Sequence, residues 1–186
     1  PVRTSVYNVA EAKQVIQLGE LIAGSSEAFW ERPFINFGYC SVVSPLTMDY
    51  DSTETMMFFA ENGITAYGTI APMGGLSTPL SLPGMLTIMN AEWLAVATLA
   101  QMSRPGTEQI YNFLPVFADM RNGAYAPGAI EIGMMNSAVC QMARFYDLPM
   151  RSSGVCAANV PDGQAMWETS NSLWASAQSG THMVYH

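Results

Sequence analysis

The sequence predicts an α/β fold in which parallel βα repeats form part of a (β/α)8 barrel, with about five strands present. Five apolar runs have the composition of strands, and each interval between them holds one helical pattern. Residues 40–45, after the first run, contain no glycine-rich phosphate loop, which argues against the rival doubly wound sheet. The chain, at 186 residues, is also shorter than the roughly 250 residues of a complete barrel.

The predicted strands are rich in β-branched and aromatic residues, which suit a pleated surface. They cover residues 34–43, 64–72, 109–116, 150–156 and 181–186. Because strands that alternate with helices form right-handed βαβ units, we expect these strands to be parallel.

The helices are predicted from their caps and from apolar periodicity. Asp51 or Ser52 is the expected cap of a helix that ends before Asn62-Gly63, and Asp162 is the expected cap of a helix over residues 163–179. The other predicted helices cover residues 9–23, 83–102 and 128–146.

We expect one partial barrel domain over residues 1–186. Residues 1–30 form a leading helix and linker in this interpretation, and residues 31–186 form the βα units. The sequence starts without Met and ends on a strand-like run, so we expect a fragment of a longer chain.

Charge and hydropathy narrow the classes of partner. The net charge is −8 with no basic cluster, whereas nucleic-acid binding needs clustered cations. No apolar run approaches the roughly 20 residues of a membrane helix, so we expect neither a nucleic-acid nor a membrane partner. An acidic chain suits a cationic ligand. Three unpaired cysteines and no targeting segment predict a cytoplasmic location.

The cysteines and histidines do not form a metal-site pattern. An odd number of cysteines without a Cys-x-x-Cys pair indicates neither a disulfide framework nor a zinc ribbon. His182 and His186 are four residues apart, which on a strand is about 13 Å and too far to share one ion. We therefore predict no metal site. His186 lies at the carboxyl end of its strand, where barrel active sites form, although a structural role explains it equally well.

Aromatic and amide side chains near the strands are the candidate binding groups. Inward-facing rings can form a cage for a quaternary ammonium, although core packing explains most of these rings. Asn36, Asn112 and Asn159 are suited to orient a carboxylate or carbonyl, or to serve as loop hydrogen-bonding groups. Cys156 lies at the end of the fourth predicted strand and is a candidate nucleophile. The nearby sequence offers only Arg151, at the other end of that strand, as a cation that could activate it.

A series of different short motifs follows in order along the chain from about residue 30 to residue 186. They are Arg32-Pro33-Phe34, Ser44-Pro45-Leu46, Ala71-Pro72-Met73-Gly74-Gly75-Leu76-Ser77-Thr78-Pro79-Leu80, Asn90-Ala91-Glu92, Arg104-Pro105-Gly106, Ala143-Arg144-Phe145-Tyr146-Asp147-Leu148-Pro149, Val160-Pro161-Asp162-Gly163-Gln164-Ala165 and Val184-Tyr185-His186. This succession resembles the trimethylamine methyltransferase family.

The resemblance implies a TIM-type barrel that moves a methyl group from an N-methylated amine to the Co(I) corrinoid of a separate carrier protein. No cofactor is then bound directly, since the corrinoid belongs to the partner. Family chains are far longer than this one. Pyrrolysine is the special catalytic residue of the methylamine branch, and we expect its position near the loop after Val155. This chain has Cys156-Ala157-Ala158-Asn159 there and no pyrrolysine.

A quaternary amine donor fits a chain without pyrrolysine. A tertiary amine must be protonated or captured before it leaves, whereas a quaternary amine already carries a positive leaving group. Such an enzyme needs mainly positioning and an aromatic, water-poor pocket. From strand position, we expect Tyr39, Tyr67 and Tyr111 to contribute to the ammonium pocket. Asn36, Asn112 and His186 are expected at the other end of the substrate, and Cys156 and Asn159 lie in the adjoining loop.

The competing interpretation is a binding or assembly module, or an inactive truncated paralogue. An open partial barrel exposes two sheet edges, so self-association is expected. A Schiff-base lyase is a third interpretation, but the sole lysine, Lys13, lies in the helix before the first predicted strand.

Overall fold

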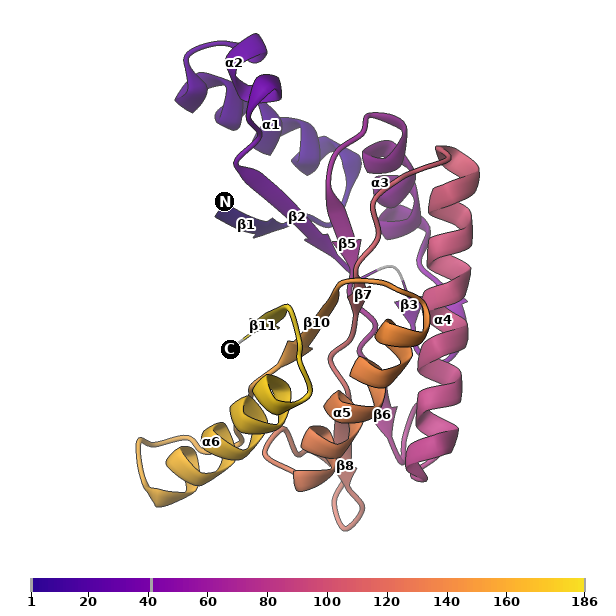
Figure 1. Cartoon of the computed structure of the whole chain (residues 1–186), viewed down its shortest axis with the longest axis vertical. Helices are drawn as coiled ribbons and strands as arrows, with labels where there is room; N and C mark the ends of the chain where they lie inside the picture. The colour runs from indigo at the N-terminus through magenta and orange to yellow at the C-terminus, as the bar shows by residue number, and fades with distance from the viewer. Residues whose placement is uncertain (1, 41, 186) are drawn as a thin grey trace. The chain divides into compact units, whose positions relative to one another are not determined.

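The structure is a computed structural model that describes residues 2–40 and 42–185, and it shows a mixed α/β protein with parallel strands (Figure 1). The chain divides into two compact units. The first unit comprises Pro1–Val43, Met48–Thr69 and Ala95–Glu108; the second comprises Ser44–Thr47, Ile70–Leu94 and Gln109–His186.

Helices and strands alternate along much of the chain. The helices are α1 (Val9–Ala23), α2 (Ser26–Glu31), α3 (Tyr50–Glu61), α4 (Leu82–Ser103), α5 (Ile130–Phe145) and α6 (Gly163–Gln178). The strands are β1 (Val2–Ser5), β2 (Ile35–Tyr39), β3 (Val42–Val43), β4 (Thr47–Met48), β5 (Ala66–Gly68), β6 (Met73–Gly74), β7 (Tyr111–Asn112), β8 (Val116–Asp119), β9 (Ala124–Tyr125), β10 (Met150–Ser153) and β11 (Met183–Tyr185).

The first unit contains a three-stranded parallel sheet in the order β1-β2-β5. Helix α1 packs against α2 and α3, and α3 contacts β5. The rings of Phe37 on β2 and Phe59 on α3 lie 4.7 Å apart between centroids, and both side chains are buried. This contact joins the sheet to α3. Burying one such side chain stabilises a fold by about 1.5–3 kcal/mol.

The second unit contains two sheets. Strands β11, β10 and β7 form a parallel sheet in that order, and α5 and α6 both pack on β10 (Figure 1). The other sheet has the order β6-β8-β9, with β6 parallel and β9 antiparallel to β8.

The helix predictions are largely confirmed, because cap residues define helix ends. Helix α1 covers the predicted residues, and its Asn8 side chain accepts the Glu11 N–H at 2.9 Å. Asp162 caps α6 as expected, by accepting the Ala165 N–H at 3.0 Å. The expected cap of α3 was wrong: Asp49, not Asp51 or Ser52, accepts the N–H of Ser52 at 2.9 Å.

The strand predictions needed more correction. Strand β1 precedes the run that we expected to be first, and its mostly exposed Val-Arg-Thr-Ser sequence has no apolar pattern. The run at 109–116 is two strands rather than one, because Pro115 has no N–H to donate to a ladder. The β8–β9 hairpin was missed although Asn122-Gly123 is a turn signal. The run at 150–156 ends as a strand at Ser153.

Helix α4 corrects the expectation about membrane spans. Its 22 residues are long and apolar enough to cross a membrane, by length and composition alone. A core helix meets the same criterion, and 33% of its most apolar window is buried inside the protein. Its side chains Met85, Met89, Glu92 and Trp93 are buried, which fits a helix that packs in a protein core.

Candidate functional site

The β7-β10-β11 sheet of the second unit has two chemically different faces. Met150 lies on the face that α5 covers, because its Sδ is 2.8 Å from Cys140 Sγ of α5. Neighbouring residues on a strand point to opposite faces, so Arg151 lies on the other face. The parallel register places Asn112 on that same face, directly across from Arg151.

Arg151, Asn112 and Tyr185 form a cluster on the face away from α5. Arg151 Nη1 donates to Asn112 Oδ1 at 2.7 Å, and the guanidinium carbon lies 4.7 Å from the centroid of the Tyr185 ring. Arg151 is 4% exposed and Asn112 is 0% exposed. A buried guanidinium over an aromatic face is a rigid fork that suits planar anions such as carboxylates. Sequence reasoning did not place Arg151 in this cluster, since the strand sequence does not say which face the helices cover.

Tyr111 faces the helices instead. Its hydroxyl donates to Asn90 Oδ1 of α4 at 2.7 Å, and Asn90 Nδ2 donates to the Tyr146 hydroxyl at 3.0 Å. The ring of Trp93 packs edge-on at 4.8 Å. Burial, with a smaller contribution from Tyr146, raises the pKa of Tyr111 above its ordinary value. Tyr111 and Asn112, adjacent in sequence, therefore do not share a face.

The first unit shows the same division. Arg3 pairs in register with Asn36, and its guanidinium carbon lies 5.6 Å from the centroid of the Tyr67 ring. Asn36 and Tyr67 thus lie on one face of the β1-β2-β5 sheet. Tyr39 lies on the opposite face, with its ring 6.3 Å from Phe59 of α3. Burial raises the pKa of Tyr39 above its ordinary value, as expected for a core residue.

The loop after β10 carries the remaining candidates. Cys156 is half-buried, and Asn159 is exposed. His186 lies outside the described residues. His182 has a structural contact, because its Nδ1 accepts the Met150 N–H at 3.1 Å. Within residues 2–40 and 42–185, no three His, Cys, Asp or Glu side chains gather as a group that could hold a metal ion.

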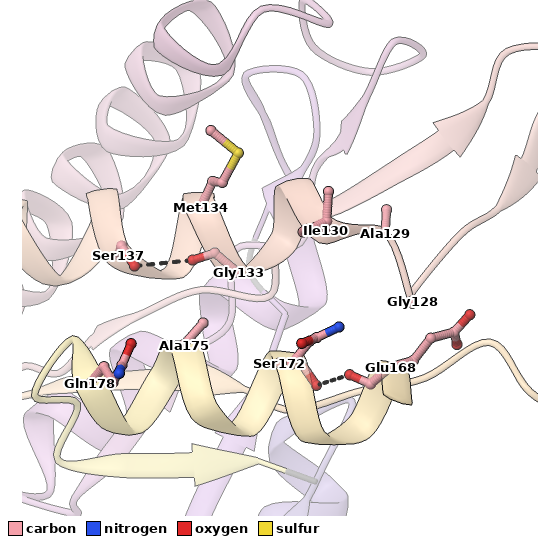
Figure 2. Close-up of a pocket in the computed structure, with 11 residues that line it drawn as sticks. Gly128, Ala129, Ile130, Gly133, Met134, Ser137, Glu168, Ser172, Ala175 and Gln178 are labelled. Carbon is pink, nitrogen blue, oxygen red and sulfur yellow. Dashed lines mark hydrogen bonds between the residues drawn. The ribbon is translucent and has the colours of Figure 1, made fainter. Parts of the chain in front are cut away.

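Helix α6 holds this loop through polar side chains that sequence reasoning missed. Glu168 Oε2 accepts the Ala157 N–H at 2.6 Å, and the Ser172 hydroxyl lies 3.2 Å from the Val155 carbonyl oxygen. Glu168 and Ser172 line a cleft of about 270 Å³ between α6 and α5. Figure 2 shows both side chains on α6, on the side that faces α5. The four-residue spacing of these polar side chains was visible in the sequence, but their partners were not.

Several family motifs have structural roles in the second unit. Glu92 of α4 is 2% exposed, and its carboxylate accepts the Ser44 hydroxyl at 2.6–2.7 Å and the Leu46 N–H at 2.9 Å. The Met73 carbonyl oxygen accepts the N–H groups of Ser77 and Thr78, which closes the turn after β6. The Ser44–Leu46 motif thus contacts the motif that ends at Glu92, and the motif after β6 closes its own turn.

Comparison with known proteins agrees with the motifs. The model of the trimethylamine methyltransferase (MTTB) family matches residues 1–186. The chain is 32% identical over 176 residues to a glycine betaine methyltransferase of Desulfitobacterium hafniense (strain Y51), covering 94% of this chain and 36% of that protein. It is 28% identical over 174 residues to the trimethylamine methyltransferase MttB of Desulfitobacterium hafniense (strain DSM 10664 / DCB-2), covering 93% of this chain and 35% of that protein.

A third relative is the trimethylamine methyltransferase MttB1 of Methanosarcina acetivorans, which is 31% identical over 163 residues, covering 87% of this chain and 33% of that protein. The chain spans about a third of the length of these curated relatives. Since the family match runs along the whole sequence, the chain belongs to the trimethylamine methyltransferase family.

Proposed function

We propose that this chain is part of a methyltransferase that moves a methyl group from an N-methylated amine to the Co(I) corrinoid of a separate carrier protein. The observation that carries the proposal is the family match over all 186 residues. Relatives named as glycine betaine and trimethylamine methyltransferases support the reaction class. The parallel βα units support a partial (β/α)8 barrel as the architecture, with residues 31–186 as its βα units.

The donor in this proposal is a quaternary amine. The methyl carbon leaves nitrogen for the cobalt nucleophile, and the electrons of the C–N bond return to nitrogen. A quaternary ammonium therefore departs as a neutral tertiary amine and needs no proton. The loop that carries Cys156-Ala157-Ala158-Asn159, without pyrrolysine, supports this donor class. Positioning and exclusion of water then supply most of the catalysis.

The donor also carries a carboxylate in this proposal, as glycine betaine does. The supporting observation is the buried cluster of Arg151, Asn112 and Tyr185. A guanidinium repels a substrate whose only charge is an ammonium, and it attracts the carboxylate of a zwitterion. We assign Asn112 and Arg151 to the carboxylate end of the donor.

Calorimetric titration of the full-length protein tests this proposal. Glycine betaine is expected to bind more tightly than tetramethylammonium or trimethylamine. Arg151→Gln should weaken glycine betaine binding by about 10- to 100-fold, because a charged hydrogen bond is lost, and should not weaken tetramethylammonium binding, because a repelling charge is removed. Retained tetramethylammonium binding in Arg151→Gln serves as the control for folding. Failure of the wild-type protein to bind any methylated amine would refute the proposal.

A further inference from the structure

We propose that Glu168 is a positioning residue that sets the course of the loop at residues 154–159. The inference rests on the proposed function and on the expectation that this loop, which carries Cys156 and Asn159, adjoins the substrate site. Its basis is a set of contacts between one face of α6 and the backbone that continues from β10.

The spacing of these contacts matches a helix beside an extended chain. Glu168, Ser172 and Ser176 are four residues apart on α6, and their partners are Ala157, Val155 and Ser153, two residues apart. Four helical residues rise about 6 Å, and two extended residues rise about 6.6 Å. Helix α6 can therefore hold the backbone extended beyond the last residue of β10, with the two segments running in opposite directions.

Glu168 makes the strongest contact of this set. Its Oε2 accepts the Ala157 N–H at 2.6 Å, and a carboxylate is a stronger acceptor than a neutral group. The Ser172 hydroxyl, in contrast, has one proton to share among Val155 O and two carbonyl oxygens of its own helix. The Ser176 contact, at 3.2 Å, anchors Ser153 within the strand rather than the loop.

Two neighbours lie against the Glu168 carboxylate. Gln164 Nε2 donates to its second oxygen, Oε1, at 2.9 Å. On the other side lies Gly128, where any side chain would overlap the carboxylate group. Figure 2 shows Glu168 extending from α6 toward Gly128, which precedes α5. The carboxylate is thus held between two loops, and its position determines where Ala157 lies.

Hydrogen exchange in the full-length protein tests the anchor. Glu168→Ala should raise the exchange rate of the Ala157 amide, followed in a peptide that covers residues 154–159, by about 10- to 100-fold, because a charged hydrogen bond is lost. Alkylation of Cys156 by iodoacetamide should accelerate as well. Glu168→Gln should restore most of the protection, since its amide oxygen can still accept the Ala157 N–H.

Asn136→Ala is the matched control. Asn136 of α5 donates to Ser153 O at 2.9 Å, so its loss should lower the melting temperature without releasing the loop. If loop exchange in Glu168→Ala equals that in Asn136→Ala, or if both equal the wild type, the anchor is refuted.

Substrate binding tests the consequence for the site. Glu168→Ala should weaken glycine betaine binding by about tenfold or more, and Glu168→Gln should regain most of it. If the loop is released but affinity is unchanged, the positioning role is refuted while the proposed function stands. If the wild-type protein binds no methylated amine, the proposed function fails. The hydrogen-exchange data then still test whether Glu168 holds the loop.

Discussion

Tyr111 illustrates how single residues connect elements in the second unit. Its hydroxyl and the Asn90 amide form a chain of hydrogen bonds that continues to Tyr146 after α5. One strand residue thereby joins two helices. Because the Tyr111 hydroxyl is buried, removal of either partner leaves a polar group without its bond, which costs about 1–3 kcal/mol.

Tyr111→Phe should accordingly lower the free energy of unfolding by about 1–3 kcal/mol, because Asn90 loses its donor. Substrate affinity should not change, since the ring faces the helices. Urea denaturation and calorimetry check the two effects separately. Tyr50→Phe, at a tyrosine that is 78% exposed, is the control, and an equal loss of stability there would contradict this account.

Asp119 and Arg121 form an ion pair at 2.7 Å in the β8–β9 turn. Hydrogen bonds from Arg121 lower the pKa of Asp119 to about 2. Since the folded-state pKa is depressed, the contribution of this pair is present above the ordinary carboxyl pKa and is lost as pH falls through about 2. NMR titration should show this value, and Arg121→Gln should raise it toward the ordinary pKa. An unchanged pKa in that variant would rule out the pair as the cause.

The candidate side chains on the strands show that a sequence can identify a strand without specifying which face of the sheet each side chain lies on. Asn36 and Asn112 were predicted as site residues, and both lie on strand faces away from the helices. Tyr39 and Tyr111 lie on the helix-covered faces. In strands that are buried on both faces, apolar residues do not alternate with polar ones, so the phase of the strand cannot be read from the pattern.

At the scale of elements, helix α4 fixes the loop that carries Ser44 and Leu46. Leu46 has a φ of 57°, a left-handed conformation that is costly for a residue with a side chain. Glu92 accepts the N–H of this residue and thus supports the conformation. The Ser-Pro-Leu and Asn-Ala-Glu motifs are therefore two halves of one structural feature.

Glu92→Ala should lower the free energy of unfolding by about 2–3 kcal/mol, because it leaves the Ser44 hydroxyl and the Leu46 N–H without their acceptor. Glu92→Gln should cost less, since one acceptor oxygen remains. Glu54→Ala, at an exposed position of α3, should stay within about 0.5 kcal/mol of the wild type. Chemical denaturation measures all three, and equal losses at positions 92 and 54 would contradict the anchoring role.

Helices were predicted better than strands for a physical reason. Asn8 and Asp162 satisfy backbone N–H groups locally, so the ends of α1 and α6 are encoded in neighbouring residues. Strand β1, in contrast, exists through its pairing with β2, which lies 33 residues away at the Val2–Ile35 pair. A pairing partner so far away in the sequence is not visible in a local pattern. The contacts of α6 with the loop after β10 could not be predicted for the same reason.

At the scale of the whole molecule, exposed apolar groups and sheet edges predict association. Trp167 and Trp174 on α6 are 56% and 66% exposed, and β11 has one neighbouring strand among the described residues. The 186-residue chain alone should therefore self-associate at micromolar concentration, as judged by sedimentation velocity. Replacing both tryptophans by Gln should weaken this association. A chain that stays monomeric would contradict this interpretation of the exposed face.

Methyl transfer to reduced cobalamin is the most direct test of the proposed function of the whole protein. Free Co(I) cobalamin can stand in for the carrier protein, and its conversion to methylcobalamin is followed by absorbance. The account predicts that the full-length protein forms methylcobalamin from glycine betaine and not from trimethylamine, with loss of the activity in Arg151→Gln. Transfer from trimethylamine alone would contradict the quaternary donor, and transfer from neither amine would contradict the methyltransferase function itself.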